Sequence, residues 1–197
     1  MRLTLLTCLL ALAATAAQAQ LDLSLNLTGI YASNPQIHAE YAISEKFGLE
    51  GSVGTKFGRD EITSSGGGTS TVTEWRRGGF LAGAQAKYYF GPDEPTTNFY
   101  GAVYARYRNT TWKDQEVNGE AVANAIDYNN NRLALGLAAG AKYLIAEKFV
   151  VEAAGGLGFA AVNDNEFVDA FEGDLDFFEK LSTLDLYARV SVGYRLF

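Results

Sequence analysis

The chain has 197 residues, a length that allows one domain or two small ones. Its 21 Gly, 11 Tyr and 12 Phe against only 3 Pro favour β-structure with crowded interior positions. The formal net charge of −7 argues against a nucleic-acid partner, which would need a basic surface.

Residues 1–19 have the pattern of a secretory signal peptide. Arg2 supplies a positive charge, Leu3–Ala17 forms an apolar core, and a small-residue A-x-A cleavage motif ends at Ala19. The apolar stretch is shorter than the roughly 18 residues that a transmembrane helix needs. Cleavage before Gln20 is therefore expected to leave residues 20–197 as one mature domain.

After the signal, segments of alternating apolar and polar residues recur along the chain, as strands of a membrane barrel do. The faces opposite the apolar residues mix Gly and Ala with isolated charges, which suits the narrow lumen of an eight-strand barrel. We therefore predict an all-β fold, an eight-stranded antiparallel up-and-down transmembrane β-barrel. The predicted strands lie within 21–31, 37–43, 47–57, 79–90, 99–108, 132–145, 149–159 and 184–196.

After a short first link, the links between these segments alternate between short and long. The short links lie near Ser33-Asn34-Pro35 and at 44–46, 91–97 and 146–148, and the long links at 59–74, 113–131 and 164–182. Outer-membrane barrels have short periplasmic turns and long external loops. The alternation therefore predicts that both termini lie on the periplasmic side.

The C-terminal residues resemble the last strand of outer-membrane barrels, which the barrel-assembly machinery recognises. Tyr194, Leu196 and Phe197 form this expected assembly signal, with Leu196 in the outward position and Phe197 one residue beyond it. The whole mature chain resembles the OmpA/OmpX-like small barrels and is similar to a Bacteroidota group of outer-membrane barrels of unknown function. The resemblance implies the fold and a bacterial outer-membrane location, and it brings no functional residue. The motifs that carry it are the hairpin 41–47, the strand end 87–90 and the hairpin 133–159.

Charged residues occupy faces that the alternation turns inward, and we predict that they form a lumen charge network. One interpretation is a cation-lined pathway for small anions. The other is a plug of paired charges, which we favour because eight strands leave little bore and an uncompensated buried charge costs several kcal/mol. Nine bases against five acids leave an excess that needs water, loops or an anion. The acids are Asp22, Glu40, Glu50, Glu152 and Asp185, and the bases are Lys56, Arg77, Lys87, Arg106, Arg108, Arg132, Lys142, Arg189 and Arg195.

The only histidine, His38, stands two residues before Glu40 on the same predicted face, so the pair could orient an imidazole as a general base. Some small barrels are lipid-modifying enzymes that use such groups. However, no Ser stands two residues after His38, and the spacing identifies no partner. We expect a lumen histidine bonded to a carboxylate, and no enzyme activity, metal or cofactor. Since Cys8 lies within the signal, thiol chemistry is excluded from the mature chain.

The long links are acidic, and 164–182 is the most acidic of them, although its spacing fits no EF-hand loop. A solvated exterior, or one bridged to lipid A phosphates by divalent ions, explains such a loop. Phe167, Phe171, Leu175 and Phe178 recur within it at helical spacing, which predicts a short amphipathic helix that caps the barrel or contacts a surface partner. Gly66-Gly67-Gly68 is expected to be a flexible loop tip and matches no phosphate-binding motif.

The function expected from these patterns is that of a structural or surface-interaction barrel. We expect a monomer in contact with outer-membrane lipid, assembled by the barrel-assembly machinery, with a surface partner at residues 164–182. Two alternatives remain open from the sequence. The first is a narrow channel for small polar or anionic solutes, and the second is a lipid-modifying enzyme.

Overall fold

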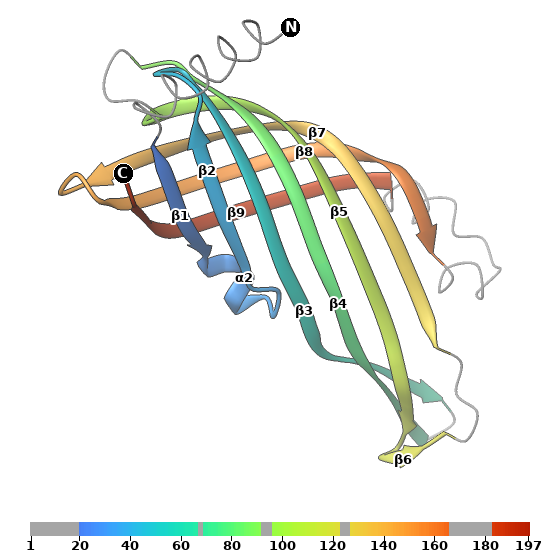
Figure 1. Ribbon diagram of the computed structural model, residues 1–197. Coiled ribbons are helices and arrows are strands. Elements are labelled where there is room, and N and C mark those ends of the chain that lie inside the picture. The colour runs from blue at the N-terminus through green and yellow to red at the C-terminus, as the bar shows by residue number, and fades with distance from the viewer. Residues whose placement is uncertain (1–19, 67–68, 92–95, 123–126, 166–182) are drawn as a thin grey trace, which may run out of the picture.

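The computed structural model describes residues 20–66, 69–91, 96–122, 127–165 and 183–197. Within these ranges eight antiparallel strands form a closed ring in the order β1-β2-β3-β4-β5-β7-β8-β9, and β9 pairs back with β1 (Figure 1). The ring strands are β1 Leu21–Asn26, β2 Gln36–Ala42, β3 Phe47–Gly66, β4 Thr69–Tyr89, β5 Asn98–Val117, β7 Tyr128–Ile145, β8 Phe149–Asn165 and β9 Leu184–Arg195. The predicted eight-stranded up-and-down barrel is confirmed.

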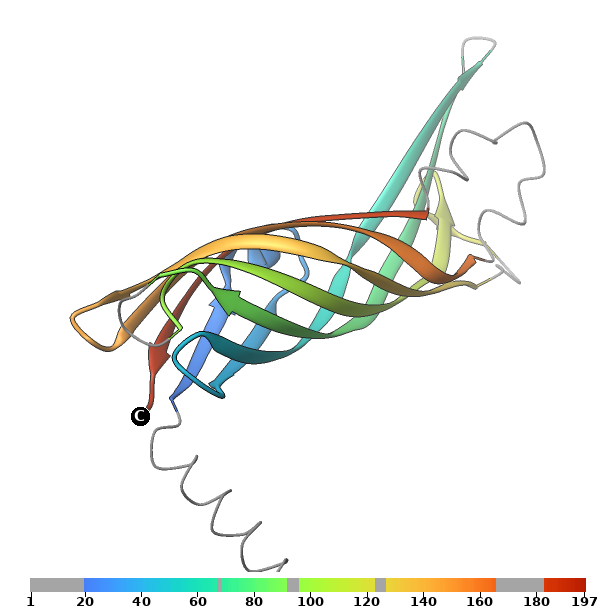
Figure 2. The ribbon, with the colours of Figure 1, turned by 90° about the horizontal axis from the view of Figure 1, so that it is seen from above.

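The two ends of the barrel differ in their connections. At one end, which we call the terminal end, β1 begins, β9 ends, and short turns join β2 to β3 and β7 to β8. At the other end, the loop end, β3 and β4 run far beyond the ring as a narrow arm (Figure 2). The two-residue strand β6 (Glu120–Ala121) pairs with β5 at this end.

Side chains alternate between an apolar outer face and a polar inner face along each ring strand. Leu137, Leu186 and Val53 are 64–67% exposed on the outside, whereas Lys87, Glu152 and Asp185 are at most 2% exposed inside. This distribution is the reverse of that in a water-soluble protein and suits a barrel that has lipid around it.

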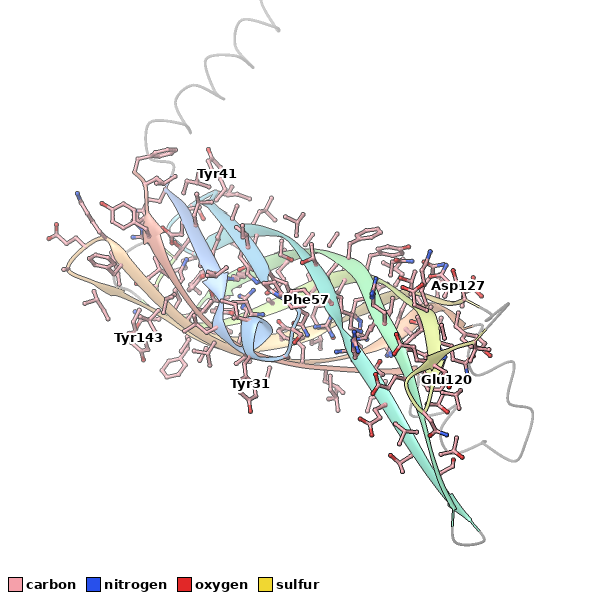
Figure 3. The ribbon with its side chains drawn as sticks, turned by 90° about the horizontal axis from the view of Figure 1, so that it is seen from below. Tyr31, Tyr41, Phe57, Glu120, Asp127 and Tyr143 are labelled. Carbon is pink, nitrogen blue, oxygen red and sulfur yellow. The ribbon has the colours of Figure 1, made fainter. Side chains whose placement is uncertain are left out.

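Aromatic side chains form a belt around the terminal end. Phe47 packs edge-on against Tyr88, which in turn contacts Phe90, with ring centroids 5.0 and 5.3 Å apart. Tyr41 and Tyr143 project outward in the same region (Figure 3). Such a belt is typical of the height at which a membrane barrel meets the lipid headgroups.

The first predicted segment was wrong beyond its sixth residue. The strand stops at Asn26 and a short helix, α2 (Leu27–Tyr31), follows. The Asn26 side chain accepts a hydrogen bond from the Gly29 backbone N–H at 3.0 Å and so caps the helix. Leu27 and Tyr31 keep the spacing of a strand face, but they are also four residues apart, which is the spacing of one helix face. No helix among the described residues is long and apolar enough to cross a membrane.

Two predicted long loops are partly strand. The ladder between β3 and β4 continues through 59–74, as far as the Gly66–Thr69 pair, and β5 continues to Val117. Thr and Val residues at 69–73 favour this extension, because β-branched side chains suit a pleated strand. Residues 67–68 of the predicted glycine tip, and the predicted helix within 166–182, lie outside the described residues.

Glycine on the inner face makes room for tyrosine rings, as the Gly-rich alternation predicted. A Cβ at Gly140 would lie 2.6 Å from the Tyr100 ring, and one at Gly158 would lie 2.6 Å from the Tyr104 hydroxyl oxygen. Tyr100 and Tyr104 pack with Tyr89, Ala102 and Ala138 in the interior cluster of the barrel. The inner-face glycines therefore allow tyrosine rings to occupy part of the barrel interior.

Candidate functional site in the charged lumen

The lumen near the terminal end holds a network of eight buried charged side chains, which we call the lower charge layer. All of them are at most 8% exposed. Four are acidic and four are basic, so the layer carries no net charge when all are ionised. Its members are Asp22, Glu40, Glu50, Glu152, Lys87, Lys142, Arg189 and Arg195.

Lys87 on β4 stands at the centre of this layer. Its Nζ lies 2.6 Å from Glu40 Oε2, 2.7 Å from Glu50 Oε2 and 2.9 Å from Glu152 Oε1. These three carboxylates are grouped closely enough to hold a metal ion. The Lys87 ammonium group already occupies the space between them and supplies the positive charge. We therefore interpret the three carboxylates as the binding site of this ammonium group and not of a metal ion.

A second group of contacts joins the layer to the ring closure. Lys142 Nζ bridges Asp22 Oδ2 at 2.9 Å and Glu40 Oε1 at 3.0 Å. Arg195 donates two hydrogen bonds to Asp22, from Nε at 2.7 Å and from Nη2 at 2.9 Å. Asp22 and Arg195 are direct partners in the β1–β9 ladder. This pairing places a bidentate ion pair across the seam where the first and last strands meet.

Arg189 completes the layer from β9. It donates to both Glu50 oxygens, at 2.5 and 3.0 Å, and to Glu152 Oε1 at 2.5 Å. Tyr89 donates its hydroxyl hydrogen to Glu40 at 2.7 Å, and Tyr100 donates to Glu152. With Tyr100 on β5 included, each of the eight ring strands contributes at least one side chain to one connected network.

His38 does not form the pair with Glu40 that the sequence suggested. Its Nδ1 lies 3.0 Å from Glu50 Oε1 and 2.7 Å from Arg189 Nη1, whereas Glu40 is bonded to Lys87, Lys142 and Tyr89. The reason is the register of β2 and β3. His38 is opposite Ser52, so Glu50 lies diagonally across from it on the same inner face.

Farther toward the loop end, three guanidinium groups surround one carboxylate, and we call this group the upper arginine cluster. Arg106 Nη2 lies 2.7 Å from both oxygens of Asp185, and Arg108 Nη2 lies 2.9 Å from Oδ1. Arg132 Nη2 is 4.0 Å from Oδ1 and donates to the Leu184 carbonyl oxygen at 2.6 Å. Three bases share a single acid here, and the Asp185 side chain is fully buried.

Two predicted lumen bases lie outside both groups. Lys56 donates to the Thr110 hydroxyl oxygen at 3.1 Å. Arg77 donates to Asp60 Oδ1 at 2.7 Å, and the Trp112 indole donates to the other oxygen of that carboxylate at 2.7 Å. Asp60 was missed from the sequence because it falls in the range 59–74 that was predicted to be a loop. If the alternation is continued beyond Lys56, Asp60 falls on the same inward face, and this spacing could have identified it.

The residues predicted for export and assembly lie at the terminal end. The Leu196 N–H donates to the Leu21 carbonyl oxygen, and the Phe197 carbonyl oxygen accepts from the Leu21 N–H. Tyr194 packs edge-on against Phe149, with ring centroids 5.7 Å apart. Gln20 accepts a hydrogen bond from the Ala42 N–H, and Ala19 lies outside the described residues.

Comparison with solved structures finds several chains that match about nine tenths of this one. The N-terminal β-barrel domain of OprF from Pseudomonas aeruginosa is 14% identical, with a TM-score of 0.40, over 90% of this chain and 96% of that chain. CarO from Acinetobacter baumannii is 13% identical, with a TM-score of 0.44, over 91% and 96%. Neisserial surface protein A is 13% identical, with a TM-score of 0.39, over 90% and 92%.

The closed ring, its apolar outer face and its aromatic belt make this protein an outer-membrane β-barrel, and the expected OmpA/OmpX-like architecture is confirmed. No curated protein matches the chain. A family model described as "Protein of unknown function (DUF3575)" matches residues 3–177, which is most of the sequence. The chain therefore belongs to the DUF3575 family.

Proposed function

We propose that this protein is a non-enzymatic outer-membrane barrel with a structural or surface-interaction role and a lumen closed by the lower charge layer. The observation that carries the proposal is the connected network through which all eight ring strands meet inside the barrel. Because every charge in it has an opposite partner within 3.0 Å, the network can remain ionised while it is buried.

The connections support an orientation with the terminal end in the periplasm. The turns at Ser44–Lys46 and Ala146–Lys148 are short, whereas the arm formed by β3 and β4 extends from the loop end. External loops of outer-membrane barrels are the longer ones. In this orientation residues 1–19 act as a signal peptide cleaved before Gln20, and Tyr194, Leu196 and Phe197 are presented to the barrel-assembly machinery.

Residues 164–182 are the segment proposed to meet a surface partner, because their sequence combines many carboxylates with regularly spaced Phe and Leu residues. A strain that produces a protein lacking 164–182 tests this role beside a null strain. We expect the barrel to assemble normally and the two strains to share their cell-surface phenotype. Wild-type behaviour of the deletion strain would remove the segment from the proposed function.

Solute influx into liposomes tests whether the lumen is closed. Protein purified from outer membranes in detergent is reconstituted, and its folding is verified by a heat-dependent shift on gels. The wild-type protein is expected to admit small sugars and chloride no faster than protein-free liposomes do. Influx that falls when Arg106 or Arg132 is neutralised would instead support a narrow anion channel.

A charge-neutral pair of substitutions tests the barrier itself. Lys87→Ala combined with Glu152→Ala removes one base and one acid from the lower charge layer, and we expect it to raise influx. Arg76→Ala combined with Asp114→Ala is the matched control, because this pair is 3.2 Å apart with side chains 67% and 60% exposed. Equal influx in folded samples of both variants would show that the layer is not the barrier.

His38 tests the enzymatic alternative. Its Nδ1 is held between Glu50 and Arg189, and we propose that the residue is structural. The outer-membrane lipid composition of cells that produce wild-type protein or His38→Ala is therefore expected to be the same. A lipid change that appears with the wild type and is lost in His38→Ala would replace the proposed function with a lipid-modifying one.

A further inference from the structure

A polar cavity of about 290 Å³ lies between the lower charge layer and the upper arginine cluster. The α2 turn bounds one side of it, and inner faces of β2, β3, β4, β5 and β9 form the rest. Figure 1 shows that β1 and β2 stop at α2, well short of the loop end that β3, β4 and β5 reach. The cavity therefore lies beside the part of the barrel wall that has the shortest strands, which we call the low wall.

The charge of the cavity wall has one sign. Arg106, Arg108, Arg189 and His38 line the cavity, and none of the described lining residues is Asp or Glu. Arg189 is neutralised within the lower charge layer by Glu50 and Glu152. Asp185 can neutralise only one of the three arginines of the upper cluster, so about two positive charges beside the cavity remain uncompensated by the described residues.

Two of these arginines are reachable by a solute. The side chains of Arg106 and Arg108 are 16% and 26% exposed, whereas that of Asp185 is fully buried beneath them. The Nε of Arg106 is buried and has no hydrogen-bond partner among the described residues. The guanidinium groups therefore retain N–H donors that a bound anion can use.

His38 presents a further ring nitrogen, Nε2, at the floor of the cavity. It is 3% exposed, and its Nε2 has no hydrogen-bond partner in the described part of the chain. Its Nδ1 faces both a donor, Arg189 Nη1 at 2.7 Å, and an acceptor, Glu50 Oε1 at 3.0 Å, so these contacts are compatible with either tautomer of the ring. In the tautomer that carries its hydrogen atom on Nε2, this atom is a buried donor without a partner among the described residues, which favours an acceptor beside it.

We propose that this cavity binds a phosphate group. A phosphate monoester carries about −1.5 to −2 charges at pH 7, which matches the excess of three arginines over one aspartate better than a carboxylate does. Guanidinium groups suit phosphate oxygens because they donate two parallel hydrogen bonds. The volume also leaves room for ordered water, since a water molecule occupies about 30 Å³.

The phosphate group could belong to a free solute or to a lipid headgroup. Ile30 and Tyr31 on α2 are 46% and 95% exposed, and Leu186 of the cavity-lining strand β9 is 64% exposed on the outer face. Apolar side chains thus flank the cavity at its low wall, where an acyl chain could lie outside while its phosphate group lies inside. The inference goes beyond the proposed closed barrel, and it is tested by binding instead of influx.

Thermal unfolding of the full protein, extracted in non-ionic detergent, tests the site in two titrations. One uses inorganic phosphate and the other uses bicelles of dimyristoyl phosphatidic acid, with phosphatidylcholine bicelles as the blank. A ligand that binds only the folded state raises the unfolding temperature as its concentration increases. A rise with inorganic phosphate supports a solute site, and a rise with phosphatidic acid alone supports a lipid site.

Arg108→Gln separates the site from general charge effects. Because Arg108 makes a single hydrogen bond to Asp185, the variant is expected to fold and to weaken binding by about tenfold or more. Arg76→Gln is the matched control, since it removes the same charge at an exposed position outside the cavity. The proposal is overturned if neither titration stabilises the wild type, or if Arg76→Gln weakens binding as much as Arg108→Gln does.

Discussion

The lower charge layer and the upper arginine cluster lie in one lumen and use the same residue types, yet they differ in charge balance. In the lower layer four acids meet four bases, and the ion pairs together with the Tyr100 hydrogen bond connect all eight ring strands. In the upper cluster Arg106, Arg108 and Arg132 share Asp185. The comparison indicates that the first group stabilises the fold and that the second is organised to receive an anion.

The largest effect is expected when a charge is removed from the balanced layer. Lys87→Met leaves Glu40, Glu50 and Glu152 without their shared base, and should lower the free energy of unfolding by about 3–5 kcal/mol. Glu152→Gln should lower the free energy of unfolding by a similar amount, because Lys87 and Arg189 lose a shared carboxylate and the layer gains an excess of positive charge. Urea unfolding in detergent, followed by tryptophan fluorescence, measures both. A loss below about 1 kcal/mol in either variant, the size of a surface pair, would contradict a stabilising role for the layer.

In the upper cluster, acid and base substitutions should differ sharply. Asp185→Asn removes the one carboxylate that holds the three arginines, and we expect a loss of about 3 kcal/mol. Arg108→Gln relieves repulsion as it removes one hydrogen bond, so the free energy of unfolding should change by less than about 1 kcal/mol. The same urea experiment compares the two variants. Equal losses would show that the cluster is balanced by charges elsewhere, and the contrast with the lower layer would disappear.

Changes in packing around the charges should lower the free energy of unfolding less than loss of a charge from the lower layer does. Gly140→Val places a branched side chain where a Cβ alone would lie 2.6 Å from the Tyr100 ring. Tyr100 donates to Glu152, so displacement of the ring also disturbs the lower layer. We expect a loss of about 1–3 kcal/mol in the free energy of unfolding. Gly51→Val is the control, because a Cβ at Gly51 meets no atom within 4 Å.

Much of this barrel follows from the alternation in the sequence, because side chains on a strand change face at every residue. That periodicity placed Lys87, Glu152 and Arg189 on the inner face without knowledge of their partners. The partners themselves depend on strand register, which the alternation leaves open by steps of two residues. For this reason the sequence predicts that His38 is bonded to a carboxylate without identifying Glu50 on the next strand as its partner.

The remaining differences have local causes. The cap made by Asn26 decides that the chain turns into α2, although Leu27 and Tyr31 continue the strand pattern. The extension of β3 to Gly66 brings Asp60 inside to meet Arg77, which removes one base from the apparent excess. Most of the excess that remains is at Arg106, Arg108 and Arg132, a group that forms only when β5 and β7 pair.

The smallest predicted effect concerns salt. Side chains of the upper arginine cluster are 13–26% exposed, so dissolved ions can screen their mutual repulsion, whereas those of the lower charge layer are buried. Raising sodium chloride from about 0.05 to 0.5 M should therefore stabilise the wild type by about 0.5 kcal/mol. Arg108→Gln should remove most of that salt dependence, and Arg76→Gln should leave it unchanged. If all three proteins showed the same salt dependence, the uncompensated charge would lie outside this cluster. Removal of Arg108 can abolish the salt effect only if the repulsion arises among the arginines of the cluster.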